Sequence, residues 1–576
     1  MTNADTSYES PGSWYYLWHL ISLGVIEATF NPLPTGGLDL GSPTITDTVW
    51  DKLKAAQPTS SEHSAKVALI DVGVSRTHPN LKDRIDGNHS IDLVTHRYGA
   101  QSAPSGGASP HAPEANKAFF GGLDITGLDT LDLNGLDAAT PGAKVWLDAL
   151  VKELKTSQGV VRTLIDTDET FGSHGTSIAG LVVGAPELVT PPAGGSPATP
   201  HPGGSPATTS NLLGGASTVC PSTSIGVIPY FGVDPLSDLI SIRSSFRPDP
   251  AHFVAAFLYA WQCGADVILL PRGLPDISAT RSLKHKVEPD DADELARFQK
   301  SPERANLLGR LEQPLANELA PNAVAPVAQP DLGWDVLEAL LVAISKKIPI
   351  VCAAGNDGES QLIYPANLAR PDNGIIAVGA VTSKGYRSGY SNYGEHLTLV
   401  APSDDGEVYN RHQLRVDRTN PMVGLHAYVA DEKNAVPYSP LSLLTTDLLG
   451  TFGYAEGSNP LASIFPPLPG AKEGIGGYYA PFGGTSGASA LIAGIAALVA
   501  RAHKAKHGSK DARLGGKEMK DKLVIACHLD RPVLADGAPP TPDTMNADNE
   551  PADHDKKYFF GAGLPNAWEA VNAALT

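Results

Sequence analysis

Short apolar runs rich in β-branched residues recur along the chain from Lys66 onward. The first is VALIDVG, and similar runs follow at residues 223–231, 265–271, 348–355, 375–381 and 397–403. Stretches with a helical spacing of apolar residues separate several of them, as at 252–264 and 333–347. Continuous apolar strands that alternate with helices are typical of a parallel sheet covered on both faces. The pattern therefore predicts an α/β fold with helices on both sides of the sheet.

Four segments interrupt this alternation and are predicted to be surface insertions, because they are rich in Gly, Pro, Ser, Asp or charged residues. They are residues 86–170, 186–217, 276–331 and 404–478. The second contains GGSPAT twice, at Gly194 and Gly203, which is typical of a flexible linker. We expect the main domain to span 66–576. Residues 1–65 form a separate segment, whose apolar run from Trp14 predicts a helix or strand that packs on that domain.

Charge and cysteine content narrow the class of protein. The chain of 576 residues has 43 Lys and Arg against 62 Asp and Glu, a formal net charge of -19, which argues against a nucleic-acid partner. Its four cysteines are too scattered for a disulfide framework or a CxxC metal site, so we expect buried thiols in a reducing compartment. The first apolar run lacks a preceding Lys or Arg and is short for a membrane span. A cytoplasmic protein without a membrane partner is expected.

Two polar residues follow or begin predicted elements of the sheet and its helices. Asp71 ends the first apolar strand, where a carboxylate can orient an imidazole, although many α/β strands end in Asp. His174 opens GSHGTSIAGLVVG, and a histidine in the first turn of a helix is biased toward the neutral form that a general base needs. A lone histidine there is usually structural. The small residues Gly175, Ala179 and Gly180 indicate close packing of this helix, and both interpretations stay open.

Two further polar residues have the same ambiguity when each is considered alone. Ser486 precedes a long apolar helix in GGTSGASALIAGIAALVA, where its hydroxyl and nearby backbone N–H groups suit a tetrahedral oxyanion. A helix N-cap serine is the alternative. Asn356 follows an apolar strand in VCAAGNDG, where its amide suits the same oxyanion, and a turn asparagine is the alternative.

Together, the order Asp71, His174, Asn356 and Ser486 and the residues that flank them resemble the subtilisin-like serine proteases, or subtilases. Further similar segments are YSNYGEHLTLVAPS from Tyr390, YPA at Tyr364, LLTTDLLGTFGYA from Leu443 and GAGLPNAWEAV from Gly561. The resemblance covers most of the chain from Lys66 onward. It implies a three-layer α/β/α sandwich with a mostly parallel central sheet, interrupted by the four insertions.

The resemblance also implies a role for each matching residue. Ser486 would attack the scissile carbonyl, His174 would transfer the proton, and Asp71 would orient the imidazole. Asn356 and the backbone N–H of Ser486 would bind the oxyanion. Two strands would bind the substrate, and their residues are Pro271, Arg272, Gly273, Ala353, Ala354 and Gly355. No cofactor is required; structural Ca²⁺ is found in many members of the family, but no metal ligand set can be assigned here.

The chain departs from the family pattern at several of these positions. Gly487 and Ala490 stand where the family usually has Met and Pro. Pro271 and Arg272 stand in the substrate strand, which usually ends in Ser-Leu-Gly. We hypothesise that Arg272 favours acidic substrate residues; an arginine that points into solvent is the alternative.

These observations support an intracellular serine endopeptidase that processes specific proteins or peptides. The long insertion at 404–478 precedes Ser486 closely and suggests a cover for the cleft or a docking surface for a regulatory protein. A catalytically silent member of the same fold, acting as a binding or scaffold module, is the alternative function. Labelling of an activated serine would separate the two.

Overall fold

The computed structural model describes the sheet, its covering helices and most of the N-terminal segment. The described residues are 14–31, 44–94, 100–102, 131, 133, 135–156, 160–162, 172–186, 230–244, 249–276, 330–383, 385–404, 427–428, 436–437, 442–448, 453–454, 478–531, 533 and 556–576. Residues 187–217 and 277–329, nearly all of the second and third predicted insertions, lie outside this set, and so does Cys220.

A nine-stranded sheet forms the centre of the described structure, in the order β11-β10-β9-β8-β3-β7-β4-β5-β6. The strands are β3 (Lys66–Asp71), β4 (Ile91–Asp92), β5 (Ala100–Ser102), β6 (Val160–Arg162), β7 (Asp238–Arg243), β8 (Val267–Leu270), β9 (Ile350–Ala353), β10 (Ile375–Val381) and β11 (Leu399–Pro402). The seven strands from β11 to β4 pair in parallel, whereas β5 pairs antiparallel with β4. The predicted α/β class with a mostly parallel sheet is confirmed.

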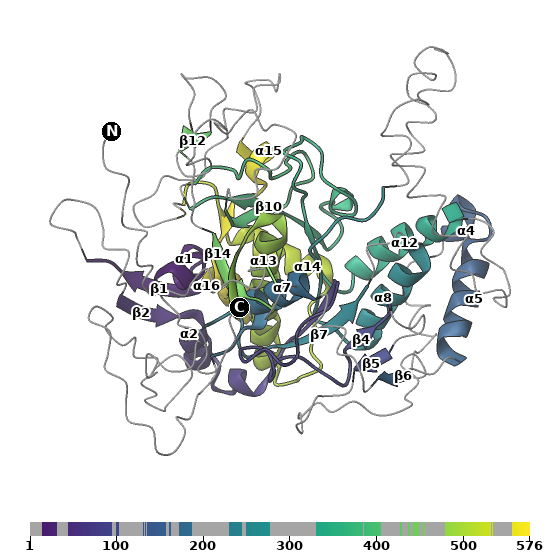
Figure 1. Cartoon of the computed structure of the whole chain (residues 1–576), viewed down its shortest axis with the longest axis horizontal. Coiled ribbons are helices and arrows are strands. Elements are labelled where there is room, and N and C mark those ends of the chain that lie inside the picture. Colours follow the sequence, from purple (N-terminus) through teal and green to yellow (C-terminus); the bar gives the residue numbers. More distant parts are fainter. Residues whose placement is uncertain are drawn as a thin grey trace, which may run out of the picture.

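Helices cover both faces of this sheet (Figure 1). One layer contains α7 (Ser173–Val183) and α13 (Gly484–His507), and the other contains α8 (Pro250–Gln262) and α12 (Pro330–Ser345). The strands β8, β9, β10 and β11 are apolar along their whole length, and every one of their residues is buried, as expected where both faces of a sheet are covered. By length and composition α13 alone among the described helices could cross a membrane, and 94% of its apolar window is buried inside the protein.

One strand differs from the prediction. The run at 223–231 was expected to form a strand, but its first seven residues lie outside the described set, and Tyr230 and Phe231 are not in a strand. In the sheet, β3 lies between β8 and β7. The sequence of β7, DLISIR, begins and ends with charged residues. A prediction from apolar runs alone therefore overlooked β7, a central strand with a charged residue at each end.

The interval 86–170, predicted as an insertion, contributes to the sheet as well as to the surface. Its β4 pairs with β7, and β5 and β6 extend the edge. A helix in the same interval, α5 (Ala143–Thr156), buries Trp146, Leu147 and Leu150. In the interval 404–478, the strand β14 (Leu443–Thr446) is fully buried and pairs antiparallel with β15 (Tyr479–Phe482). Both intervals therefore contain parts of the core.

The N-terminal segment packs into the same hydrophobic core. It forms α1 (Trp14–Ser22), β1 (Ile26–Thr29), β2 (Thr44–Thr48) and α2 (Val49–Ala56). Trp18 and Trp50 are buried in the core cluster, and their indole N–H groups donate to Ser442 O at 3.1 Å and Val233 O at 3.0 Å. Because a buried indole N–H needs an acceptor, these two bonds fix the segment on the main body of the protein.

His19 of α1 is a buried polar group in this contact. Its side chain is 0% exposed, and neither ring nitrogen has a hydrogen-bond partner among the described residues. Burial lowers the pKa of His19 from 6.5 to about 3. The folded protein therefore keeps this imidazole neutral, while the unfolded chain protonates it below pH 6.5.

We expect acid to destabilise the protein partly through His19. The stability that depends on a neutral His19 is complete above pH 6.5 and is lost as the pH falls toward 3, at roughly 1.4 kcal/mol per pH unit. His19→Leu removes this dependence. In urea unfolding, the stability of the variant relative to the wild type should rise by about 2–3 kcal/mol between pH 7 and pH 4.5. An unchanged difference between the two proteins across this range would contradict the assignment.

Candidate active site

The four candidate residues meet at one edge of the sheet. Asp71 is the last residue of β3, and Asn356 follows the end of β9. His174 and Ser486 lie in the first turns of α7 and α13. Parallel strands present their carboxyl ends at the same edge, where ligands bind in open α/β sheets. The topology thus brings together residues that are far apart in the sequence.

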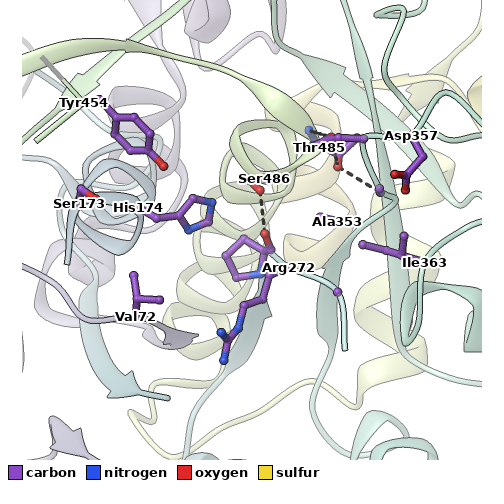
Figure 2. Close-up of a pocket in the computed structure, with 14 residues that line it drawn as sticks. Val72, Ser173, His174, Arg272, Ala353, Asp357, Ile363, Tyr454, Thr485 and Ser486 are labelled. Carbon is purple, nitrogen blue, oxygen red and sulfur yellow. Dashed lines mark hydrogen bonds between the residues drawn. The ribbon is translucent and has the colours of Figure 1, made fainter. Parts of the chain in front are cut away.

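Asp71 and His174 are joined by a short hydrogen bond. The distance between His174 Nδ1 and Asp71 Oδ2 is 2.7 Å, and the Asp71 side chain is 1% exposed. The second carboxylate oxygen accepts from the backbone N–H of Val72 at 2.7 Å. Because the carboxylate accepts a hydrogen bond from the Nδ1–H group, the tautomer that this bond favours leaves the lone pair on Nε2. Figure 2 shows the His174 ring directed toward Ser486.

The approach of α7 to β3 depends on a glycine. A Cβ atom on Gly175 would lie 2.0 Å from the carbonyl oxygen of Gly73 and 3.5 Å from Cβ of Asp71. Gly73 itself has a φ of 121°, which favours glycine. The sequence pattern of small residues after His174 therefore has a direct steric cause: only glycine permits the distance at which the imidazole reaches the carboxylate.

The Ser486 hydroxyl lies in the same pocket. Its Oγ donates to the carbonyl oxygen of Pro271 at 2.7 Å, the contact that Figure 2 marks beneath Ser486. Proline lacks a backbone N–H, but its carbonyl remains available as an acceptor. The departure at Pro271 thus still leaves a backbone partner for the hydroxyl.

Asn356 is held by the residue that precedes Ser486. Its Oδ1 accepts from Thr485 N at 2.9 Å and from Thr485 Oγ1 at 2.8 Å. Thr485 Oγ1 in turn accepts from Gly355 N at 3.1 Å. With the amide oxygen occupied twice, the group that Asn356 can offer to a ligand is the Nδ2 donor. The role of Thr485 in positioning Asn356 was not predicted from the sequence, although Thr485 directly precedes Ser486.

A cavity of about 410 Å³ surrounds these groups. Its lining residues are Val72, Ser173, His174, Pro271, Arg272, Gly273, Ala353, Gly355, Asn356, Asp357, Ile363, Tyr454, Thr485 and Ser486. Five of the six predicted substrate-binding residues are among them. Ala354 is not: it is fully buried, and its N–H and carbonyl are bonded to Val378 and Ile363. Ala354 was expected to face a substrate, but the structure places it in the interior, away from the cavity.

Arg272 does not point into solvent, so that alternative is wrong. The residue is 9% exposed, its Nη2 donates to Ser244 Oγ, and its guanidinium carbon lies 5.5 Å from the Phe253 ring centre. Burial lowers the pKa of the Arg272 guanidinium, while the charge of Asp71 acts in the opposite direction. Figure 2 shows the side chain directed away from Ser486. This orientation gives no support to the hypothesis that Arg272 selects acidic substrate residues.

Two other features of the site bear on the sequence predictions. A Cβ atom on Gly487 would lie 2.7 Å from Leu443 Cδ1, so a larger residue after Ser486 would require the Leu443 side chain of β14 to shift. Among the described residues, no group of three or more His, Cys, Asp or Glu side chains is arranged to hold a metal ion.

Comparison with known proteins adds a family match. The sequence model of the subtilase family matches residues 329–561. A calcium-dependent protease of Nostoc sp. is 27% identical over 226 residues, which are 39% of this chain and 24% of that protein. An intracellular serine protease of Paenibacillus polymyxa is 36% identical over 73 residues, 12% of this chain and 21% of that protein. The chain spans about a quarter of the length of the curated relatives that it matches.

The solved structures to which the chain is similar are more distant in sequence. A lanthipeptide protease is 14% identical, with a TM-score of 0.40 over 97% of this chain and 94% of that chain. The prenylagaramide maturation protease PagA is also 14% identical, with a TM-score of 0.37 over 92% and 98%.

Gly175→Ala should separate His174 from Asp71. The added methyl group would collide with the Gly73 carbonyl, so α7 must shift away from β3. We expect the low-field proton NMR signal of the hydrogen-bonded Nδ1–H to disappear and the stability to fall by about 1–3 kcal/mol. Gly135→Ala is the matched control, because nothing lies within 4 Å of a Cβ atom there. Retention of the signal in Gly175→Ala would refute this steric account.

Proposed function

We propose that this chain, which belongs to the subtilase family through residues 329–561, is a serine endopeptidase that cleaves specific protein or peptide substrates. The single observation that carries the proposal is that His174, Ser486 and Asn356 line one cavity while Asp71 is hydrogen-bonded to His174 behind it. A carboxylate, an imidazole, a hydroxyl and an amide donor are the groups that acyl transfer to serine needs.

In the proposed reaction, Ser486 Oγ attacks the scissile carbonyl carbon while its proton passes to Nε2 of His174. The oxyanion accepts hydrogen bonds from Asn356 Nδ2 and the backbone N–H of Ser486. When the tetrahedral intermediate collapses, the C–N bond breaks and the leaving amine takes the proton from His174. Water then attacks the acyl-enzyme ester by the same route and releases the acid. Asp71 keeps the imidazole oriented and stabilises its charged form.

The hydrogen bond from Ser486 to Pro271 O defines the resting position of the hydroxyl. For attack, the hydroxyl rotates so that its proton faces His174 instead. This rotation is a change of χ1. The resting bond is also the observation that favours the alternative function, a binding module in which Ser486 never reacts.

The proposal has three further parts: an intracellular location, a regulatory protein partner and structural Ca²⁺. An intracellular location and a regulatory protein partner are supported by the sequence alone. The name of the Nostoc relative, a calcium-dependent protease, keeps structural Ca²⁺ within the proposal as a stabilising ion. Every group in the proposed reaction belongs to the protein chain, so the chemistry itself requires no cofactor.

A fluorophosphonate probe should distinguish a protease from a silent binding module. The probe phosphonylates a serine that an adjacent base activates, so we expect one adduct at Ser486 and none in Ser486→Ala. Mass spectrometry of the digested protein locates the adduct. The wild-type protein without any adduct would favour the binding module, and an adduct on another serine would refute the assignment of Ser486.

Asn356→Leu should slow catalysis without abolishing substrate binding. Removal of one oxyanion donor typically lowers kcat by about 10²–10³, with a smaller effect on KM. Steady-state hydrolysis of a peptide substrate measures both constants. Asn572→Leu, an exposed position on α16 (Ala567–Leu575) outside the cavity lining, is the control and should leave kcat unchanged. Equal kcat values for the wild type and Asn356→Leu would exclude Asn356 from the oxyanion site.

A further inference from the structure

Tyr454 lies in the cavity although the proposed reaction does not use it. It belongs to the chain between β14 and β15 and lines the cavity together with His174 and Ser486. It is 45% exposed, one of five exposed large hydrophobic residues among those that the structure describes. A large aromatic side chain that faces an open cavity is a candidate contact for a ligand.

The backbone at Tyr454 is fixed by a buried carboxylate. The N–H of Tyr454 donates to Asp447 Oδ1 at 2.9 Å, and Asp447 is 1% exposed. Asp447 follows β14, and its own N–H donates to Tyr478 O, just before β15, at 2.7 Å. Gly453 packs so closely that a Cβ atom would lie 2.1 Å from Leu448 O. The exposed ring therefore stands on an anchored backbone.

The ring of Tyr454 continues an aromatic surface that begins at His174. Its centre lies 5.5 Å from that of Phe482, with an angle of 68° between the planes. Phe482 is 5% exposed, and its ring centre lies 5.6 Å from that of His174. We call Tyr454 and Phe482 the aromatic wall. Edge-to-face contacts of this kind are favourable and hold the rings in defined positions.

The position of this wall relative to His174 indicates which part of a substrate it meets. In the proposed reaction His174 gives its proton to the leaving amine, so the leaving group lies against the imidazole. Figure 2 shows Tyr454 beside His174, across Ser486 from Ala353 and Ile363. By the same reasoning Ala353, across Ser486 from His174, is on the acyl side.

We propose that Tyr454 determines specificity for the residue directly after the scissile bond, and that the aromatic wall prefers a large apolar or aromatic side chain there. This inference rests on the proposed endopeptidase function. The charges of the described lining residues support an apolar preference. Asp357 lies across Ser486 from Tyr454, and the guanidinium of Arg272 is directed away from the cavity centre. A half-exposed tyrosine ring gains most from a partner that covers its apolar surface.

Partition of the acyl-enzyme tests this proposal directly. A peptide thiobenzyl ester forms the acyl-enzyme, and phenylalanine amide, leucine amide or glycine amide then competes with water for it. Because the acyl group is the same in every reaction, the ratio of aminolysis to hydrolysis reports only the leaving-group side. We expect the wild type to favour phenylalanine amide over glycine amide by about tenfold.

Two substitutions at Tyr454 should differ in their effect on this preference. Tyr454→Ala should bring the ratio for phenylalanine amide to within about twofold of that for glycine amide, whereas Tyr454→Phe should retain the preference. Ile525→Ala removes another exposed apolar side chain, 74% exposed and outside the lining residues of this cavity, and should match the wild type. Liquid chromatography of the products gives each ratio.

The outcomes separate this inference from the function on which it rests. If Tyr454→Ala is still labelled at Ser486 by the fluorophosphonate but keeps the wild-type preference among amides, the inference is overturned alone. It is also overturned if Tyr454→Ala alters selectivity only for the residue before the scissile bond. A wild-type protein that forms neither adduct nor acyl-enzyme overturns the proposed function and this inference with it.

Discussion

The candidate site depends on how closely α7 can approach the end of β3. The 2.7 Å bond between His174 and Asp71 exists only because Gly175 adds no atom between the helix and the Gly73 carbonyl. On the same helix, a Cβ atom on Gly180 would lie 2.2 Å from Thr446 Oγ1 of β14. The two glycines thus allow α7 to pack between the sheet and the antiparallel pair of β14 and β15. This pair in turn places Phe482 against the imidazole of His174. The geometry of the candidate site therefore depends on two positions of α7 that have no side chain, Gly175 and Gly180.

A second dependence links the position of Ser486 to that of Asn356. Thr485 bonds to Asn356 through both its N–H and its hydroxyl, so the end of β9 and the start of α13 are set as one unit. Tyr390 supports the same turn, because its hydroxyl accepts from Gly484 N at 3.0 Å and lies 2.8 Å from Ser403 Oγ. Buried polar groups that are fully paired specify a single arrangement. Here they fix the backbone directly before Ser486.

The fold could be predicted from the sequence where burial is uniform. The apolar runs that became β3, β8, β9, β10 and β11 signal two buried faces, and the family motifs identified all four candidate residues. Contacts between distant segments could not be predicted from the sequence, because each depends on a partner from another element. Examples are the hydrogen bond from Thr485 to Asn356, the burial of Arg272 against Ser244, and the backbone hydrogen bonds of Ala354 to Val378 and Ile363. The strand β7 was missed because charged residues stand at both of its ends.

The glycine after Ser486 has a chemical consequence beyond packing. Where a relative has methionine at this position, a thioether lies beside the nucleophile, and oxidants convert it to a bulky polar sulfoxide. This chain has four methionines. Only Met519 is among the described residues, and it is fully buried in α14 (Gly516–Ile525). The residues that line the cavity include neither methionine nor cysteine. Gly487 therefore places no sulfur directly after Ser486, so peroxide finds no thioether to oxidise at that position.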